Sequence, residues 1–209
     1  MQVVMRETGQ QKAHFMGESS GALRAGFYAT IEPERVDRLV LAAFTYKGTD
    51  SPTLKKRAEQ VEYFRAHNLR KRDRAMIESI FTRDKPGTTD PGVGKILADV
   101  ELQFGDQIPT GTYLDMTANL PVVDPKKVRA PVLLVRGEYD GIATVEDLFD
   151  FYQQLPHGDK QLVIRAFGRG RHQPSPVLAC RAQLPRHAGA SGDLTRRIGR
   201  TPAGPIASR

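Results

Sequence analysis

The pentapeptide Gly17-Glu18-Ser19-Ser20-Gly21 constrains the fold more than any other stretch of the sequence. It matches the pattern G-x-S-x-G, in which a serine lies at a sharp turn between a β-strand and an α-helix. A short strand at 12–16 is expected before it, and a helix rich in small residues is expected at 20–30. The flanking glycines let the backbone double back without a Cβ clash. The pattern therefore predicts a strand–turn–helix unit with Ser19 at the turn.

Apolar runs later in the chain predict a parallel sheet. The segment 36–44 is rich in leucine and valine, as expected for a strand covered on both faces. A second such run, at 128–135, precedes an amphipathic helix at 144–155 and a further strand at 161–164. Strand, helix and strand at this spacing form a βαβ unit. The chain is therefore expected to be an α/β protein.

The segment 50–120 differs from its surroundings because helical periodicity replaces the strand pattern. Ser51 followed by Pro52 is a strong helix start, with a capping hydroxyl and a proline at the first helical position. Three further helices are expected, at about 71–81, 93–104 and 110–118. We interpret 50–120 as an all-helical insertion in the α/β core.

Three stretches resemble the α/β-hydrolase family. The stretch 14–26, HFMGESSGALRAG, is similar to that family's nucleophile strand, elbow and helix. The stretch 33–41, PERVDRLVL, is similar to the turn and parallel strand that follow. The stretch 128–140, VRAPVLLVRGEYD, resembles the strand whose end bears the catalytic acid. The resemblance covers residues 1 to about 167 and implies a partial parallel sheet of the α/β-hydrolase fold, with 50–120 as a cap or lid.

The resemblance and the changes in composition divide the chain into four parts. Residues 1–49 would form the nucleophile-strand half of the hydrolase core, and 121–167 the βαβ part that bears the acid. Residues 50–120 would form the helical lid. Residues 168–209, called the tail below, contain eight arginines and one acid among many Gly, Pro, Ala and Ser residues. This composition predicts disorder in the tail.

The family resemblance implies acyl transfer by a serine triad in the chain order Ser, Asp, His. Ser19 would be the nucleophile, Asp140 the acid that orients the histidine, and His172 the base. The backbone N–H of Ser20 would donate to the oxyanion. Each triad position has an alternative: Ser19 as an ordinary helix N-cap, Asp140 as a turn residue, and His172 as a solvated residue of the tail. Glu138 also matches family-like residues, with an exposed loop acid as its alternative.

The start of the chain leaves a second functional hypothesis open. The elbow of the resembling family follows its fifth strand, whereas sixteen residues precede Gly17. The loop after the third strand, which supplies the other oxyanion donor, then has no counterpart, and the strand before Ser19 would lie at a sheet edge. The alternative to an active hydrolase is therefore a catalytically incompetent fragment, truncated at its N-terminus and divergent or frameshifted in the tail.

The composition indicates a soluble globular protein, with 209 residues of which 39% are apolar and 26% charged. No apolar run approaches the ~20 residues of a membrane span, and the N-terminus lacks the apolar core of a secretory signal. Cys180 is the only cysteine, which excludes an internal disulfide and favours the cytoplasm. The spacing of His, Cys and Asp suggests no metal site, and no cofactor is expected.

The net charge of +7 belongs to the tail, since residues 1–167 hold equal numbers of basic and acidic side chains. Nucleic-acid binding is therefore not expected of the folded part, and the basic run 70–74 is interpreted as a solvated helix start. The partner implied by the resemblance is a small acyl compound such as an ester. A further hypothesis assigns RNA or acidic partners to the arginine-rich tail. The sequence leaves the oligomeric state open.

Overall fold

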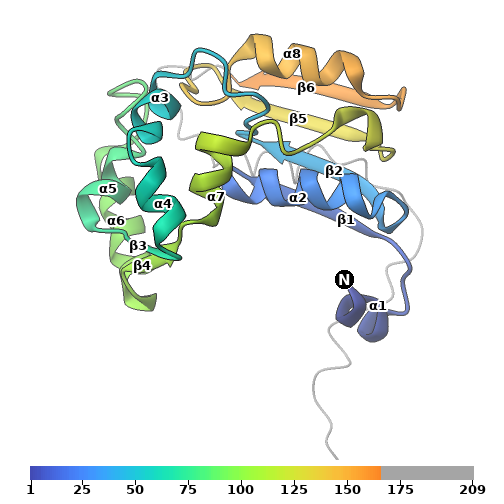
Figure 1. The fold of residues 1–209 in the computed structure, drawn as a ribbon, viewed down its shortest axis with the longest axis horizontal. Coiled ribbons are helices and arrows are strands. Elements are labelled where there is room, and N and C mark those ends of the chain that lie inside the picture. The colour runs from blue at the N-terminus through green and yellow to red at the C-terminus, as the bar shows by residue number, and fades with distance from the viewer. Residues whose placement is uncertain (166–209) are drawn as a thin grey trace, which may run out of the picture.

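A four-stranded parallel sheet forms the centre of the computed structural model, which describes residues 1–165 apart from the side chain of Pro91 (Figure 1). The strand order is β1-β2-β5-β6. The bounds are Ala13–Glu18 for β1, Val36–Ala42 for β2, Val132–Gly137 for β5 and Lys160–Arg165 for β6. Leu41 of β2 lies between Gly17 of β1 and Leu134 of β5. The predicted α/β class is confirmed, and β1 lies at an edge of the sheet that residues 1–165 form.

Two helices, α2 (Ser20–Ile31) and α8 (Val145–Gln154), pack into one core cluster with the sheet. Three alanines of α2 are buried in that cluster. Gly26 of the same helix leaves little room for a side chain, because a Cβ there would lie 3.1 Å from Cγ2 of Val123, which would have to shift. The small residues of α2 therefore allow the helix to approach its neighbours closely.

Strand β2 is buried on both of its faces. Leu39 and Leu41 belong to the core cluster that includes α2 and α8. Val40 and Ala42, which point to the opposite face, form a second cluster with Val135 of β5. Burial on both faces is the physical reason for the leucine- and valine-rich run in this part of the sequence.

The segment between β2 and β5 forms a separate group of short elements at one end of the sheet (Figure 1). Its helices are α3 (Pro52–Ala58), α4 (Val61–Ala66), α5 (Arg74–Ser79), α6 (Pro91–Glu101) and α7 (Gly111–Leu114). Its strands, β3 (Leu69–Lys71) and β4 (Gln107–Pro109), form an antiparallel pair. Outside this segment, helix α1 spans Gln2–Thr8 and a short helical turn spans Pro33–Arg35. Three more short helical turns lie within the segment, at Leu102–Phe104, Asp115–Asn119 and Pro125–Lys127.

The antiparallel pair is the main difference from the predicted all-helical insertion. Residues 69–71 were expected to lead into a helix, but they pair with 107–109 instead. The pairing continues next to the strands, where the Thr110 amide donates to the carbonyl of Asn68 at 3.0 Å. Because the two strands are far apart in the sequence, the local pattern of either one does not reveal the pairing.

Two side-chain contacts fasten the insertion to the sheet and its helices. The hydroxyl of Ser51, which is fully buried, accepts from the Leu54 amide at 3.3 Å and donates to the carbonyl of Gly141 at 2.8 Å. The first contact caps α3, as predicted, and the second joins α3 to the loop after β5. Arg24 of α2 donates to the hydroxyl of Thr112 in α7 at 3.1 Å. Both ends of the insertion are therefore held against the core.

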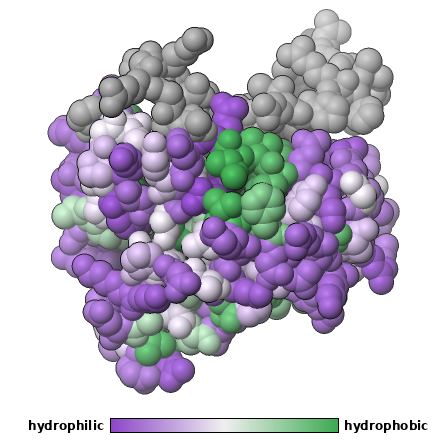
Figure 2. Space-filling view, turned by 90° about the horizontal axis from the view of Figure 1, so that it is seen from above, coloured by the Kyte–Doolittle hydropathy of each residue, from purple (hydrophilic) through white to green (hydrophobic). Residues whose placement is uncertain are grey.

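The surface seen from above in Figure 2 is mainly hydrophilic, with a compact hydrophobic area in its upper middle and smaller ones near its lower edge. Charged residues make up 26% of the sequence, which is an ordinary share for a globular protein. Among the helices of residues 1–165, none combines the length and the apolar character needed to cross a bilayer.

Candidate active site

Ser19 lies at the turn between β1 and α2, as the pentapeptide predicts. Its backbone has φ 53° and ψ −118°, a region that residues with a side chain rarely occupy. The Ser19 amide donates to the carbonyl of Ala42 in β2 at 2.9 Å, and its carbonyl accepts from the Ala22 amide at 3.0 Å. These bonds hold the strained turn in place, and the Ser19 residue is exposed.

The turn depends on Gly17 more than on Gly21. A Cβ at Gly17 would lie 2.3 Å from the carbonyl oxygen of Gly21 and 2.6 Å from the amide nitrogen of Ala22. A Cβ at Gly21 would meet no atom within 4 Å. The first glycine of the motif is therefore required by the close approach of strand and helix, whereas the second has open space beside it.

The side chain of Ser19 makes no capping hydrogen bond to α2. An ordinary N-cap serine would accept from an amide in the first turn of the helix, so Ser19 occupies the N-cap position of α2 without capping the helix through its hydroxyl. Ser20 is the first residue of α2 and is half-buried. The first amides of a helix lack partners within the helix, so the Ser20 N–H is suited to bind an oxygen with negative charge.

Asp140 lies in the loop that follows β5 and is half-buried. Its Oδ1 accepts from the backbone amides of Ile142 at 2.9 Å and Ala143 at 3.0 Å. This is the local hydrogen bonding of an aspartate in a turn. One carboxylate oxygen is therefore engaged in shaping the loop, and Oδ2 is the oxygen that can accept from a further donor.

The side chain of Arg136, which is buried near the end of β5, holds the loop that bears Asp140. Its Nε donates to the carbonyl of Ala143 at 2.5 Å, and Nη1 donates to the carbonyls of Gly137 and Glu138 at 2.7 and 2.9 Å. Its Nη2 donates to the carbonyl of Asp140 at 2.9 Å. A single guanidinium thus satisfies four backbone carbonyls and fixes the position of the loop.

The sheet brings Ser19 and Asp140 to the same edge. Ser19 follows β1 and Asp140 follows β5, and β2 lies between these two parallel strands. The carboxyl ends of parallel strands meet at one edge of a sheet, which is where ligands bind in open α/β folds. His172, the predicted base, lies outside the described residues. Glu138 is exposed in the loop, as its alternative interpretation expected.

Glu18, immediately before Ser19, is the residue nearest to the turn whose pKa is shifted. Burial of part of its surface raises the pKa of the Glu18 carboxyl above its usual value. The histidine nearest to Ser19 in the sequence is His14 of β1. It is exposed, and its Nδ1 lies 3.0 Å from the carboxylate of Asp37. His14 is therefore engaged with a surface acid.

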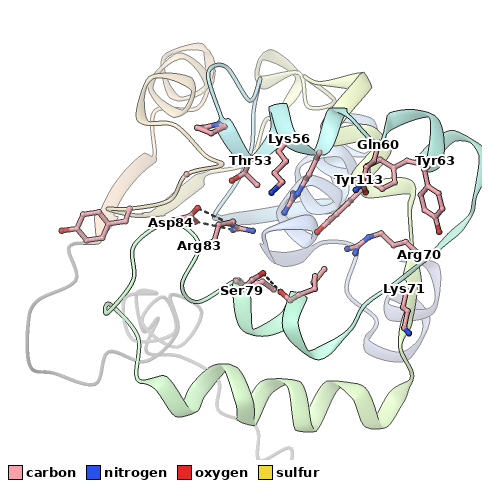
Figure 3. A pocket seen from close by; sticks show the side chains of 17 residues that line it. Thr53, Lys56, Gln60, Tyr63, Arg70, Lys71, Ser79, Arg83, Asp84 and Tyr113 are labelled. Atoms are coloured by element: carbon pink, nitrogen blue, oxygen red, sulfur yellow. Dashed lines mark hydrogen bonds and ion pairs between the residues drawn. The ribbon is translucent and has the colours of Figure 1, made fainter.

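A cavity of about 840 Å³ lies within the insertion and extends to the loop that bears Asp140 (Figure 3). Tyr139 and Gly141, the neighbours of Asp140, line it, whereas Ser19 and Asp140 do not. Its other walls come from α3, α4, β3, α5, the segment after α5, and α7. Its volume lies within the range of about 300–1,000 Å³ typical of small-molecule sites.

Sequence reasoning missed the residues of this cavity. The run 70–74 is expected to be a solvated helix start, whereas Arg70 lies in β3 and faces the cavity, half-buried. Arg57 and Tyr113 reach the same space from α3 and α7. No local signal distinguishes these side chains from surface residues, because their meeting depends on the pairing of β3 with β4. Within residues 1–165, no group of three or more His, Cys, Asp or Glu side chains could hold a metal ion.

The comparison with protein families gives one match, to the family described as serine aminopeptidase, S33, over residues 1–174. No curated protein matches the chain in sequence. The family match covers most of the chain, including the turn at Ser19 and the loop at Asp140.

Solved structures with the same arrangement of sheet and helices are similar to the chain. The monoacylglycerol lipase of Paleococcus ferrophilus is 19% identical, with a TM-score of 0.56 over 79% of this chain and 62% of that one. An α/β-hydrolase fold protein from Chitinophaga pinensis is 17% identical, with a TM-score of 0.52 over 78% and 60%. A meta-cleavage product hydrolase from Pseudomonas fluorescens is 18% identical, with a TM-score of 0.51 over 78% and 59%. The chain thus spans 59–62% of the length of these structures.

Proposed function

The chain belongs to the serine aminopeptidase S33 family of α/β-hydrolases, and we propose that it is a serine hydrolase that cleaves an ester or a similar acyl compound at Ser19. The observation that carries the proposal is the strained backbone of Ser19, with φ 53°, at a strand-to-helix turn where its side chain does not cap the helix. Backbone strain of this kind persists only where the surrounding structure holds the residue in place, and strained residues cluster at active sites.

In the proposed reaction, Oγ of Ser19 attacks the carbonyl carbon of the substrate, and its proton passes to the imidazole of His172. The bond between that carbon and the alcohol oxygen then breaks, and the alcohol leaves with the proton. Water next attacks the acyl-serine and gives one proton to the imidazole. The carboxylic acid is released, and Oγ of Ser19 recovers its proton from the imidazole. Both steps are redox-neutral.

Two other groups would assist these steps. Asp140 would orient and stabilise the imidazolium through Oδ2, because its Oδ1 already accepts two backbone amides. The N–H of Ser20, at the start of α2, would donate to the oxyanion that forms on the carbonyl oxygen. The position of Ser19 and Asp140 at one edge of the sheet supports this division of roles.

The insertion would act as the lid of this site. It lies at one end of the sheet (Figure 1), and the bond from Ser51 to the carbonyl of Gly141 joins it to the loop of Asp140. A lid at this position would exclude water from the acyl-serine until the alcohol has left. The cavity within the lid, which extends to the loop of Asp140, would then receive the part of the substrate that does not react.

A fluorophosphonate probe tests the proposal with the full chain. We expect the folded wild type to be labelled, and Ser19→Ala to show no labelling while retaining the wild-type melting temperature. Trypsin should release the peptide from Ala13 to Arg24, and its fragment spectrum distinguishes a label on Ser19 from one on Ser20. A label elsewhere would overturn the assignment of Ser19, and a folded wild type without label would favour the catalytically incompetent alternative.

A further inference from the structure

The cavity within the insertion is strongly basic. Five basic side chains and one acid line it, namely Lys56, Arg57, Arg70, Lys71, Arg83 and Asp84. The acid, Asp84, is paired with Arg83 at 3.1 Å. In Figure 3, Lys56 and Arg70 extend from opposite sides toward the space in front of Tyr113. The excess of positive charge is notable because residues 1–167 as a whole are neutral.

Two of the guanidinium groups stack on one aromatic ring. The Cζ atoms of Arg57 and Arg70 lie 4.4 and 3.7 Å from the centre of the Tyr113 ring. The ring face attracts both cations and fixes the planes of their guanidinium groups. Arg57 also donates to Sδ of Met116 at 3.6 Å. These contacts hold both arginines against the Tyr113 ring without neutralising their charge.

Both arginines lack an ion-pair partner within residues 1–165, and Nε of Arg70 is buried there without a hydrogen-bond partner. Burial lowers the pKa of both guanidinium groups, and the positive charges of Arg83 and Arg70 lower the pKa of Arg57 further. In the opposite direction, Tyr113 raises the pKa of both guanidinium groups and Asp84 raises that of Arg57. Placing cations close together away from water is unfavourable unless an anion joins them.

The remaining lining is partly apolar. Phe64, Met76, Ile80 and Tyr113 contribute carbon surface to the same cavity. A small inorganic anion would leave this surface uncovered, whereas an organic anion would cover it and reach the guanidinium groups with its charged end. Guanidinium pairs bind both carboxylate and phosphate oxygens well.

We propose that this cavity binds the anionic group of the substrate, a carboxylate or phosphate carried on an apolar chain. The inference rests on the proposed function, since it names the substrate class of the same site. Tyr139 and Gly141 connect the cavity to the loop of Asp140, whereas Ser19 does not line it. The charged end would therefore be held at a distance from the carbonyl that Ser19 attacks, and the cavity would select for an anion at the far end of the chain.

The first test compares two esters with the full chain. They are 4-nitrophenyl hexanoate, which is neutral, and 4-nitrophenyl hydrogen adipate, which carries a terminal carboxylate on a chain of the same length. We expect kcat/KM to be at least about tenfold higher for the charged ester, because a hydrogen bond to a charged group contributes about that factor. Sodium chloride at 1 M should reduce the preference.

Three variants test which side chains cause the preference for the charged ester. Arg70→Gln and Lys56→Gln should each raise KM for the charged ester by about tenfold and raise KM for the neutral ester much less. Lys56 is exposed at the cavity, so its replacement tests the proposal even if Arg70→Gln fails to fold. Lys55→Gln is the matched control, because Lys55 lies on the same helix, pairs with Asp50 at 3.2 Å and does not line the cavity.

A second measurement separates this inference from the proposed function. Calorimetry of the wild type with hexanoate, hexyl phosphate and hexan-1-ol measures binding without any reaction. Binding of either anion but not of the alcohol, weakened in Arg70→Gln and Lys56→Gln, would support the anion site even if neither ester is hydrolysed. The tighter of the two anions identifies the charged group. Equal and measurable rates of hydrolysis of both esters, or the absence of binding by both anions, would overturn the inference.

Discussion

Nη2 of Arg136 donates to the backbone carbonyl of Asp140 at 2.9 Å, so a buried side chain of β5 holds the residue proposed as the catalytic acid. The same guanidinium bonds the carbonyls of Gly137, Glu138 and Ala143. Loops are ordinarily more mobile than the strands they follow. Here the loop is tied to the strand by a residue of the strand itself, and Asp140 is therefore fixed relative to the sheet.

Replacement of Arg136 should destabilise the fold. Arg136→Met leaves several carbonyls without donors, and we expect the free energy of unfolding in urea to fall by about 3 kcal/mol. Arg129→Met is the matched control, because Arg129 is exposed and its ion pair with Glu34 contributes less than about 1 kcal/mol. If both variants unfold at the same urea concentration, the bonds from Arg136 do not support the loop as described.

Asp140→Asn should separate the charge of the carboxylate from its role in the turn. Asparagine Oδ1 can still accept the amides of Ile142 and Ala143, so the melting temperature should be retained. The rate of ester hydrolysis should fall by about 10⁴-fold, since the amide does not stabilise an imidazolium. Asp140→Ala should lose both stability and activity. A fully active Asp140→Asn enzyme would remove Asp140 from the proposed triad.

The two glycines of the motif should differ in their tolerance of alanine. In Gly17→Ala the new Cβ would lie 2.3 Å from the carbonyl oxygen of Gly21, and the strain should cost about 3 kcal/mol of stability. Gly21→Ala places its Cβ in open space and should melt close to the wild type. Thermal unfolding of the two variants measures this contrast, which would fail if Gly21→Ala were the less stable one.

The raised pKa of Glu18 predicts a pH dependence of stability. Below pH 4.5, the usual pKa, the carboxyl is protonated in both states and contributes nothing. As the pH rises above that value, the unfolded state loses its proton first, so ionisation favours unfolding. Glu18→Gln should therefore melt at the wild-type temperature at pH 4 and at a higher temperature at pH 7. Glu59→Gln, at the end of α3, is the control, and an equal gain at both pH values would contradict the assignment.

The sequence predicted the elements of the core well. The strand–turn–helix unit at Ser19, the buried strand β2 and the βαβ unit that carries Asp140 all have strong local patterns. Prediction was weaker in the insertion, where the helix expected to start at Pro52 ends at Ala58 and a second one begins at Val61. Short elements with few buried residues carry weak patterns, and their limits are set by contacts with distant parts of the chain.

The parts of the candidate site also differ in how far the sequence alone predicts them. Ser19 could be identified from five consecutive residues because a strained turn, two glycines and a helix start are all local properties. The basic cavity could not be identified in this way, because Arg57, Arg70 and Tyr113 come from three elements, α3, β3 and α7, that only the tertiary structure brings together. Backbone conformation follows from neighbouring residues, whereas the electrostatic character of a cavity follows from which distant side chains the packing brings together.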